Sequence, residues 1–215
     1  MIMPIFDEKI RKQLIDLLGD IPEKVNIILF TSENNCRSCN DTKQYMTEFA
    51  DLHENIVLKV YDFDKDKEEV ERYHIERVPA IAILDKNMKD NGIRFYGIPA
   101  GYEIHSLMAA VKDTAGVAEG ITEEQVERIK KIDKDVVIKV FVTPTCPHCP
   151  TAVIYAHKIA LRNDKIRGEM IEATTFSALA QQYGVRGVPK IIINETNEFV
   201  GAQPLDKFLE VIESL

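Results

Sequence analysis

Two pairs of cysteines carry the chemistry that this sequence suggests. The first pair is Cys36 and Cys39, in the segment NCRSC, and the second is Cys146 and Cys149, in the segment TCPHCP. The chain has 4 cysteines, so all of them lie in C-x-x-C pairs. Thiolates at this spacing can bind a metal ion, form a static disulfide, or form a disulfide that is made and broken. The sequence therefore predicts metal binding or redox chemistry at each pair.

The size and charge of the chain narrow the class of protein. Its 215 residues are enough for two small domains, and a core of this size needs no cross-link to hold it together. The formal net charge of −8 disfavours nucleic acid and anionic membrane surfaces as main partners. No apolar stretch reaches the roughly 18 residues of a membrane span. The first residues lack the basic leader and apolar segment of a secretory signal, so we expect a cytoplasmic protein.

An internal repeat organises the chain. One Val-Pro dipeptide ends at Pro79 and another ends at Pro189, and each is followed by an apolar segment rich in isoleucine. The distance along the sequence from Cys36 to Pro79 equals the distance from Cys146 to Pro189. Chance rarely places two such pairs in one register, so we interpret the chain as two copies of a unit of about 100 residues. Two glycines separate helical segments between the copies, which predicts domains at residues 1–117 and 118–215.

Hydrophobic periodicity predicts the same order of elements in both copies: helix, strand, helix, strand, helix, strand, strand, helix. In the first copy we expect helices at 7–18, 37–50, 66–73 and 102–112 and strands at 25–31, 56–61, 80–84 and 93–96. In the second copy we expect helices at 122–132, from about 147, at 175–183 and at 205–213, with strands at 136–142, 166–172, 191–194 and 198–200. Thr122 and Gln125 form a capping-box pattern, and Pro147 suits a first helical turn.

A strand, a C-x-x-C at the start of the next helix and a Val-Pro before the third strand together resemble the thioredoxin fold. Two such units in one chain resemble the protein disulfide oxidoreductases, the glutaredoxin-like proteins of thermophilic archaea and bacteria. The resemblance covers nearly the whole chain. It implies an α/β fold of two tandem thioredoxin-like units, each a central mixed β-sheet flanked by helices. We expect these units to pack through their sheets or edges.

The resemblance also implies how substrate and electrons reach the cysteines. Pro79 and Pro189 are expected to be cis and to face the cysteines, although few X-Pro bonds are cis in general. The backbones of Val78 and Val188 are then expected to hold an extended substrate segment by strand-like pairing. The partners implied are protein thiols and disulfides, with electrons from a flavoprotein of the thioredoxin-reductase kind.

Thiol–disulfide exchange requires one thiolate that attacks and a second thiol that releases the mixed disulfide. A cysteine at a helix N-terminus meets unpaired N–H groups and the positive end of the helix dipole, which lower its thiol pKa. We therefore predict Cys36 and Cys146 as attacking thiols and Cys39 and Cys149 as resolving thiols. The chain contains no nucleotide-binding fingerprint, so we expect redox-active disulfides and no bound cofactor.

The residues between the cysteines predict that the two centres differ. His148 can donate to the Cys146 thiolate or place positive charge near it, and Pro147 precedes it in the same turn. The first centre has Arg37 and no proline. We therefore predict a lower thiol pKa for Cys146 than for Cys36.

Two charged residues suggest a proton relay. Thioredoxin carries a buried carboxylate on the strand before its C-x-x-C, and neither corresponding strand here contains Asp or Glu. Lys139 lies on the second of these strands, and Glu169 lies on the strand expected beside it. A buried lysine needs a partner, so we hypothesise a Lys139–Glu169 relay, against the alternatives of a purely structural pair or no contact. The remaining histidines are expected on surfaces or helix sides: His53, His74, His105 and His157.

The sequence predicts a dithiol–disulfide oxidoreductase that reduces, oxidises or isomerises disulfides in other proteins. A glutathione-dependent glutaredoxin is an alternative, but its pattern has Thr before Val-Pro, where this chain has Arg77 and Gly187. Four thiolates could instead bind zinc, although zinc ribbons separate their pairs by about 15–20 residues. An iron–sulfur centre, a chaperone-like module and a redox-inactive first unit are further alternatives, the last because CRSC departs from the commoner motifs.

Overall fold

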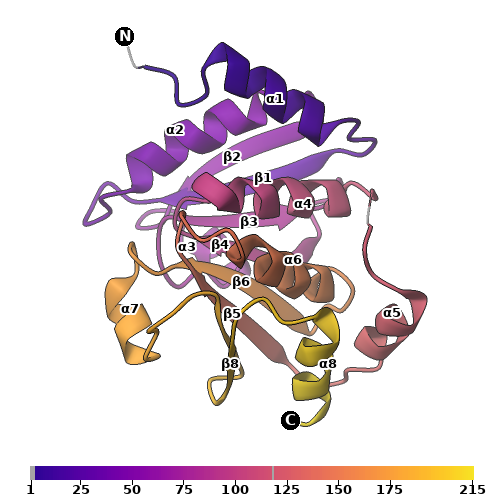
Figure 1. Cartoon of the computed structure of the whole chain (residues 1–215). Helices are drawn as coiled ribbons and strands as arrows, with labels where there is room; N and C mark the ends of the chain where they lie inside the picture. The colour runs from indigo at the N-terminus through magenta and orange to yellow at the C-terminus, as the bar shows by residue number, and fades with distance from the viewer. Residues whose placement is uncertain (1–2, 118) are drawn as a thin grey trace.

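The computed structural model describes residues 3–117 and 119–215, and its elements follow the predicted order (Figure 1). The first unit comprises α1 (Glu8–Leu18), β1 (Val25–Thr31), α2 (Cys39–Ala50), β2 (Ile56–Asp62), α3 (Lys67–Arg72), β3 (Ala80–Leu84), β4 (Asp90–Tyr96), the 3₁₀ turn η1 (Gly101–Glu103) and α4 (Ile104–Thr114). The second unit comprises α5 (Glu123–Lys130), β5 (Val136–Val142), α6 (Cys149–Ala160), β6 (Ile166–Glu172), α7 (Ser177–Gln182), β7 (Lys190–Ile193), β8 (Asn197–Val200) and α8 (Leu205–Glu213). The predicted boundary falls in the connection between α4 and α5, where residue 118 lies outside the described residues.

The eight strands in the described part of the chain form one mixed sheet, in the order β2-β1-β3-β4-β6-β5-β7-β8. Within each unit one strand pair is parallel and the other two are antiparallel. The units join through β4 and β6, which pair in parallel from Ile93↔Gly168 to Tyr96↔Ile171. The predicted packing of the units is therefore an edge-to-edge contact between sheets, and the α/β fold class is confirmed.

Helices cover both faces of the sheet (Figure 1). One face packs against α1, α2, α4, α6 and α8, and its core contains both Cys146 and Cys149. The other face packs against the shorter α3 and α7. Helices α4 and α6 lie side by side across the junction of the units. Because side chains alternate along a strand, the inner strands β1, β3, β4, β6, β5 and β7 supply apolar residues to both cores.

Local sequence signals explain several helix ends. Asp7 caps α1 by accepting a hydrogen bond from the Ile10 N–H at 2.8 Å. The capping box of Thr122 and Gln125 is present at the start of α5. Helix α6 begins at Cys149, just after the predicted start near Pro147, and its first turn contains Pro150. Both prolines lie where no intrahelical N–H is needed, so the sequence could not distinguish them.

Close backbone contact and buried polar groups complete the junction. Gly92 has φ +70°, and a Cβ there would lie 2.3 Å from the Ile166 carbonyl oxygen, so only glycine fits. His157, predicted at a surface or helix side, is buried, with Nε2 3.1 Å from the Arg94 carbonyl oxygen. Lys158 donates to both carboxylate oxygens of Asp113, at 2.8 and 2.6 Å, joining α6 to α4. The two units therefore share a closely packed interface with specific polar contacts.

Candidate redox sites

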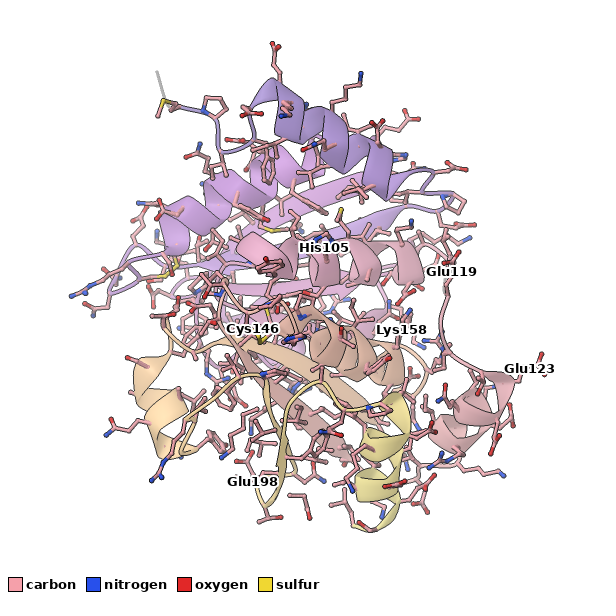
Figure 2. All side chains as sticks on the ribbon, viewed as in Figure 1. His105, Glu119, Glu123, Cys146, Lys158 and Glu198 are labelled. Atoms are coloured by element: carbon pink, nitrogen blue, oxygen red, sulfur yellow. A yellow bond between two sulfur atoms is a disulfide. The ribbon has the colours of Figure 1, made fainter. Side chains whose placement is uncertain are left out.

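Each C-x-x-C lies between the end of a strand and the start of a helix. Cys36 and Cys39 follow β1, and Cys146 and Cys149 follow β5. Both pairs are disulfides, with Cα–Cα distances of 5.4 Å and 5.5 Å. Figure 2 shows Cys146 at the start of α6, near the centre of the molecule. The repeat thus positions two equivalent dithiol centres.

The helix begins at the second cysteine of each pair, which corrects the predicted start near residue 37. The first cysteine lies in the turn just before the helix N-terminus. Cys36 is half-buried and Cys146 is 9% exposed, whereas Cys39 and Cys149 are 2% and 0% exposed. In both pairs the first sulfur is thus the more accessible.

Both Val-Pro dipeptides have the cis peptide bond that the resemblance implies. Pro79 leads into β3 and Pro189 leads into β7. The Val188 carbonyl oxygen lies 3.8 Å from the Cys146 Sγ, and Val78 lines the same groove as Cys36. Each cis bond therefore faces its own disulfide.

The predicted tuning residues all lie on the surface beside the cysteines. The side chains of Arg37, Pro147 and His148 are exposed. His148 is the residue before the first turn of α6, and its side chain makes no capping hydrogen bond. These side chains can influence a thiolate only through charge or contacts formed when the disulfide opens.

The predicted contact between Lys139 and Glu169 is not formed. The two residues are partners in the register of β5 and β6. However, the Lys139 ammonium contacts the Glu195 carboxylate and donates to the Tyr183 hydroxyl at 3.1 Å, and the Glu169 carboxylate accepts from Arg167 at 2.6 Å.

Strand alternation adds a second obstacle to the relay. Residues 139 and 169 alternate with Val140 and Met170, which face the core that contains Cys149. The side chains of Lys139 and Glu169 therefore lie on the α7 side of the sheet, and the sheet separates them from the thiols. The structure thus offers no path for the hypothesised relay.

A buried carboxyl that sequence reasoning missed lies near the second centre. Glu103, at the end of η1, is 1% exposed, and burial raises the pKa of its carboxyl from 4.5 to about 7. The Ser106 hydroxyl donates to Oε2, and Oε1 has no partner among the described residues. In the sequence, Glu103 resembles an ordinary acidic residue at a helix start, so no local signal distinguishes it.

Element η1 packs directly on the loop that carries Cys146. The Tyr102 N–H donates to the Pro144 carbonyl oxygen at 3.0 Å. Gly101 has φ +62°, and a Cβ there would lie 2.2 Å from the same oxygen. Element η1 also contacts α6. Glu103 of the first unit is therefore held close to the second redox centre.

The described residues were also compared with the requirements of a metal site and of a membrane span. Among them, no three His, Cys, Asp or Glu side chains gather in an arrangement that could hold a metal ion. The two cysteine pairs belong to separate centres, whereas tetrahedral zinc needs its four ligands together. Within the same part of the chain, no helix has the length and apolar character that a membrane crossing requires.

Comparison with known proteins gives consistent results. A family model described as a thioredoxin domain matches residues 136–214. A protein disulfide oxidoreductase from Aeropyrum pernix k1 is 30% identical, with a TM-score of 0.91 over 99% of this chain and 94% of that chain. A mutant of the alkylhydroperoxide reductase component AhpF from Enterococcus faecalis (V583) is 28% identical, with a TM-score of 0.90 over 96% of this chain and 99% of that chain.

The curated relatives are longer than this chain. The NADH dehydrogenase of Bacillus subtilis (strain 168) is 26% identical over 185 residues, and the match covers 78% of this chain and 36% of the relative. The chain spans about a third of the length of the curated relatives that it matches.

Two C-x-x-C disulfides, each beside a cis Val-Pro bond in a thioredoxin-type unit, define a dithiol–disulfide oxidoreductase. Enzymes of this class exchange an internal disulfide for one in a substrate. The likeness to the Aeropyrum enzyme extends over both units and reaches 30% identity. The chain belongs to the protein disulfide oxidoreductase family.

Proposed function

We propose that Cys36 and Cys146 attack substrate disulfides and that Cys39 and Cys149 resolve the products. The observation that carries this assignment is the difference in burial within each pair, since the first cysteine is more exposed than the second, 9% for Cys146 against 0% for Cys149. The helix N-terminus beside each pair favours a thiolate there. Arg37 and His148 each place a cation or a hydrogen-bond donor near the attacking thiolate. Pro147 restricts the backbone between Cys146 and Cys149.

The exchange proceeds in two balanced steps at either centre. The Cys146 thiolate attacks one sulfur of a substrate disulfide, and the other substrate sulfur leaves as a thiolate. The Cys149 thiolate then attacks Cys146 in the mixed disulfide and releases the second substrate thiolate. The enzyme dithiol is oxidised and the substrate disulfide is reduced, and the reverse sequence introduces a disulfide.

Substrate polypeptide binds beside the cis bonds in this proposal. Neither Val78 nor Val188 forms a backbone–backbone hydrogen bond within the described part of the chain. Their peptide groups are thus free to pair with an extended segment, and the Val188 carbonyl lies next to the attacking sulfur. Pro79 and Pro189 keep these groups at the surface. We take protein disulfides as the substrates.

Glu103 assists proton movement at the second centre in this proposal. A carboxyl with a pKa of about 7 can hold or release a proton near neutral pH. Its position beside the loop that carries Cys146 supports a role in setting the protonation of the buried Cys149 thiol. A change of Glu103 to Gln should then alter the pH dependence of product release at that centre and leave the first centre unchanged.

Electrons for net reduction come, in this proposal, from a flavoprotein of the thioredoxin-reductase kind. The chain corresponds to about a third of relatives named as an NADH dehydrogenase and as a component of alkyl hydroperoxide reductase, which supports a redox partner outside these residues. The protein itself uses its disulfides and no bound cofactor. A reductase-coupled assay tests this source, and activity that requires glutathione instead would favour the glutaredoxin alternative.

The proposal also includes the bounds of the two units and the cellular compartment. We take residues 1–117 and 118–215 as the two functional units. All cysteines lie in C-x-x-C pairs, which is typical of catalytic disulfides in a reducing compartment, so we propose a cytoplasmic protein. Cell fractionation would test the compartment.

A redox titration tests the central proposal. The protein is poised in dithiothreitol buffers, alkylated and analysed by mass spectrometry. We expect each pair to convert reversibly between dithiol and disulfide, and insulin reduction to fall when either pair is changed to serine. Thiols that resist oxidation until a chelator is added would refute the redox role in favour of metal binding.

A further inference from the structure

The joining of the units places one loop of the second unit next to the first redox centre. The loop 173–176 follows β6, which pairs with β4 of the first unit. Its counterpart in the repeat follows β2, the outermost strand of the sheet. Loop 173–176 of the second unit therefore contacts the first unit, whereas the corresponding loop of the first unit contacts only its own unit.

The first centre opens into a groove with walls from both units. The groove has a volume of about 500 Å³ and contains Cys36, Arg37 and Val78 of the first unit. Its opposite wall is formed by Thr174, Thr175, Phe176 and Ser177 of the second unit. The groove is large enough for a short polypeptide segment. The hydroxyl groups and the guanidinium make most of its lining polar.

A different groove lies beside Val188 of the second centre, and neither Cys146 nor Cys149 lines it. A volume of about 480 Å³ beside Val188 is lined only by residues of the second unit. Its lining includes the apolar side chains of Ala173, Ala180 and Val185. The first unit contributes nothing to this groove among the described residues. Thr174 and Ser177 line both grooves, so the two surfaces differ in their other residues: Arg37 and Thr175 at the first centre, and the apolar side chains beside Val188 at the second.

The wall at the first centre is held rigidly. Glu172 is 4% exposed, and its carboxylate accepts from the Thr174 N–H at 2.9 Å and the Thr175 N–H at 2.7 Å. Both threonine hydroxyls also donate to it. Gly97 of the first unit permits this arrangement, because a Cβ there would lie 2.6 Å from the Glu172 Cβ. The loop is therefore fixed against the first unit before substrate arrives.

We propose that residues 174–177 determine the substrate specificity of the first centre. The groove there binds an extended polypeptide whose residues next to the cysteine are small and polar. Beside an apolar side chain, the Arg37 guanidinium and the Ser177 hydroxyl of this groove would lose hydrogen bonds to water without replacement, which disfavours such substrates. A substrate segment bound at the second centre meets the more apolar groove beside Val188, which favours apolar substrate residues there. This inference rests on the proposed roles of Cys36 and Cys146.

Two single-centre proteins test the preference. One carries Cys146→Ser and Cys149→Ser, and the other carries Cys36→Ser and Cys39→Ser, each in the full chain. Their reduced forms react with two peptides, in which serines or leucines flank a cysteine held in the same mixed disulfide with a chromogenic aromatic thiol. We expect the first centre to favour the serine peptide and the second to favour the leucine peptide, by about tenfold each. Equal preferences at the two centres would overturn the inference.

A blocking substitution tests the wall itself. Thr175 is exposed and lines only the groove of the first centre, so Thr175→Trp should fill that groove, while the Thr175 N–H can still donate to Glu172. The Thr175→Val variant, which loses the same hydroxyl group but does not fill the groove, controls for the lost hydrogen bond to Glu172. Thr196→Trp is the matched control, because Thr196 is also exposed in the second unit and lies outside both grooves.

We expect Thr175→Trp to slow the reaction of Cys36 with the serine peptide by about tenfold or more. The reactions of Cys36 with hydroxyethyl disulfide and of Cys146 with either peptide should not change. An unchanged peptide rate, or an equal loss with hydroxyethyl disulfide, would overturn the proposed wall. A parent protein in which Cys36 attacks no disulfide would instead refute its proposed role as a nucleophile, and the inference with it.

Discussion

The buried carboxyl of Glu103 makes the stability of this enzyme depend on pH in a predictable direction. Burial raises its pKa from 4.5 to about 7 in the folded protein. The folded state therefore binds more protons than the unfolded state between these pH values, and the free energy of unfolding falls as pH rises through them. The full difference corresponds to about 3 kcal/mol. The loss of stability caused by ionising the buried Glu103 carboxyl is absent below pH 4.5 and complete above pH 7.

The substitution Glu103→Gln removes the ionisable proton and keeps the shape of the side chain. The quantity of interest is the unfolding free energy of the variant minus that of the parent. We expect this difference to increase by about 3 kcal/mol from pH 4 to pH 8. Denaturant unfolding of the oxidised proteins across this range measures it. The matched control is Glu124→Gln, since Glu124 is an exposed residue on α5. A parent–variant difference that does not change with pH would show that Glu103 ionises normally, and the reasoning from burial would fail.

Three further predictions concern the thiols, the junction and a buried histidine. Cys146 should have a lower thiol pKa than Cys36, measured from alkylation rates against pH on the single-centre proteins; equal midpoints would contradict the role of His148. Gly92→Ala should destabilise the protein in denaturant by at least about 2 kcal/mol more than Gly184→Ala, because both glycines have positive φ but only Gly92 has a backbone atom in the way; equal losses would refute the close contact. Burial lowers the pKa of His157 to about 3, so its contribution to stability should fall as pH drops below its unfolded value near 6.5. Titration of the imidazole by NMR tests this, and a pKa near 6.5 would contradict it.

The cysteine pairs and the repeat could be predicted because their signals are local. A C-x-x-C before a helix and a Val-Pro before a strand depend on a few adjacent residues, and the same spacing in both copies makes a chance match improbable. Element order followed from hydrophobic periodicity, and most bounds agree within a few residues. The sequence does not determine the exact start of α6, because Pro147 and Pro150 both suit the region before or within a first turn.

The residues around the cysteines were harder to place. Lys139 and Glu169 occupy paired positions on neighbouring strands as expected, but each finds a different partner. A charged side chain selects among all groups within reach, and the sequence does not show that Glu195 and Arg167 come closer. Glu103 was missed for the converse reason, since its burial arises from packing of η1 on the loop before Cys146.

The two-unit organisation, the cysteine pairs and the residues that flank them can all be identified without coordinates. These features are properties of short segments and of their repetition. The pairing of β4 with β6 is different, because parallel edge strands carry no local signal that names a partner, and it emerges only when the whole chain folds. That one pairing buries His157, brings Glu103 near the second centre and sets loop 173–176 beside Cys36. Two equivalent motifs thereby acquire different surroundings, because contacts between units act on positions that the repeat makes alike.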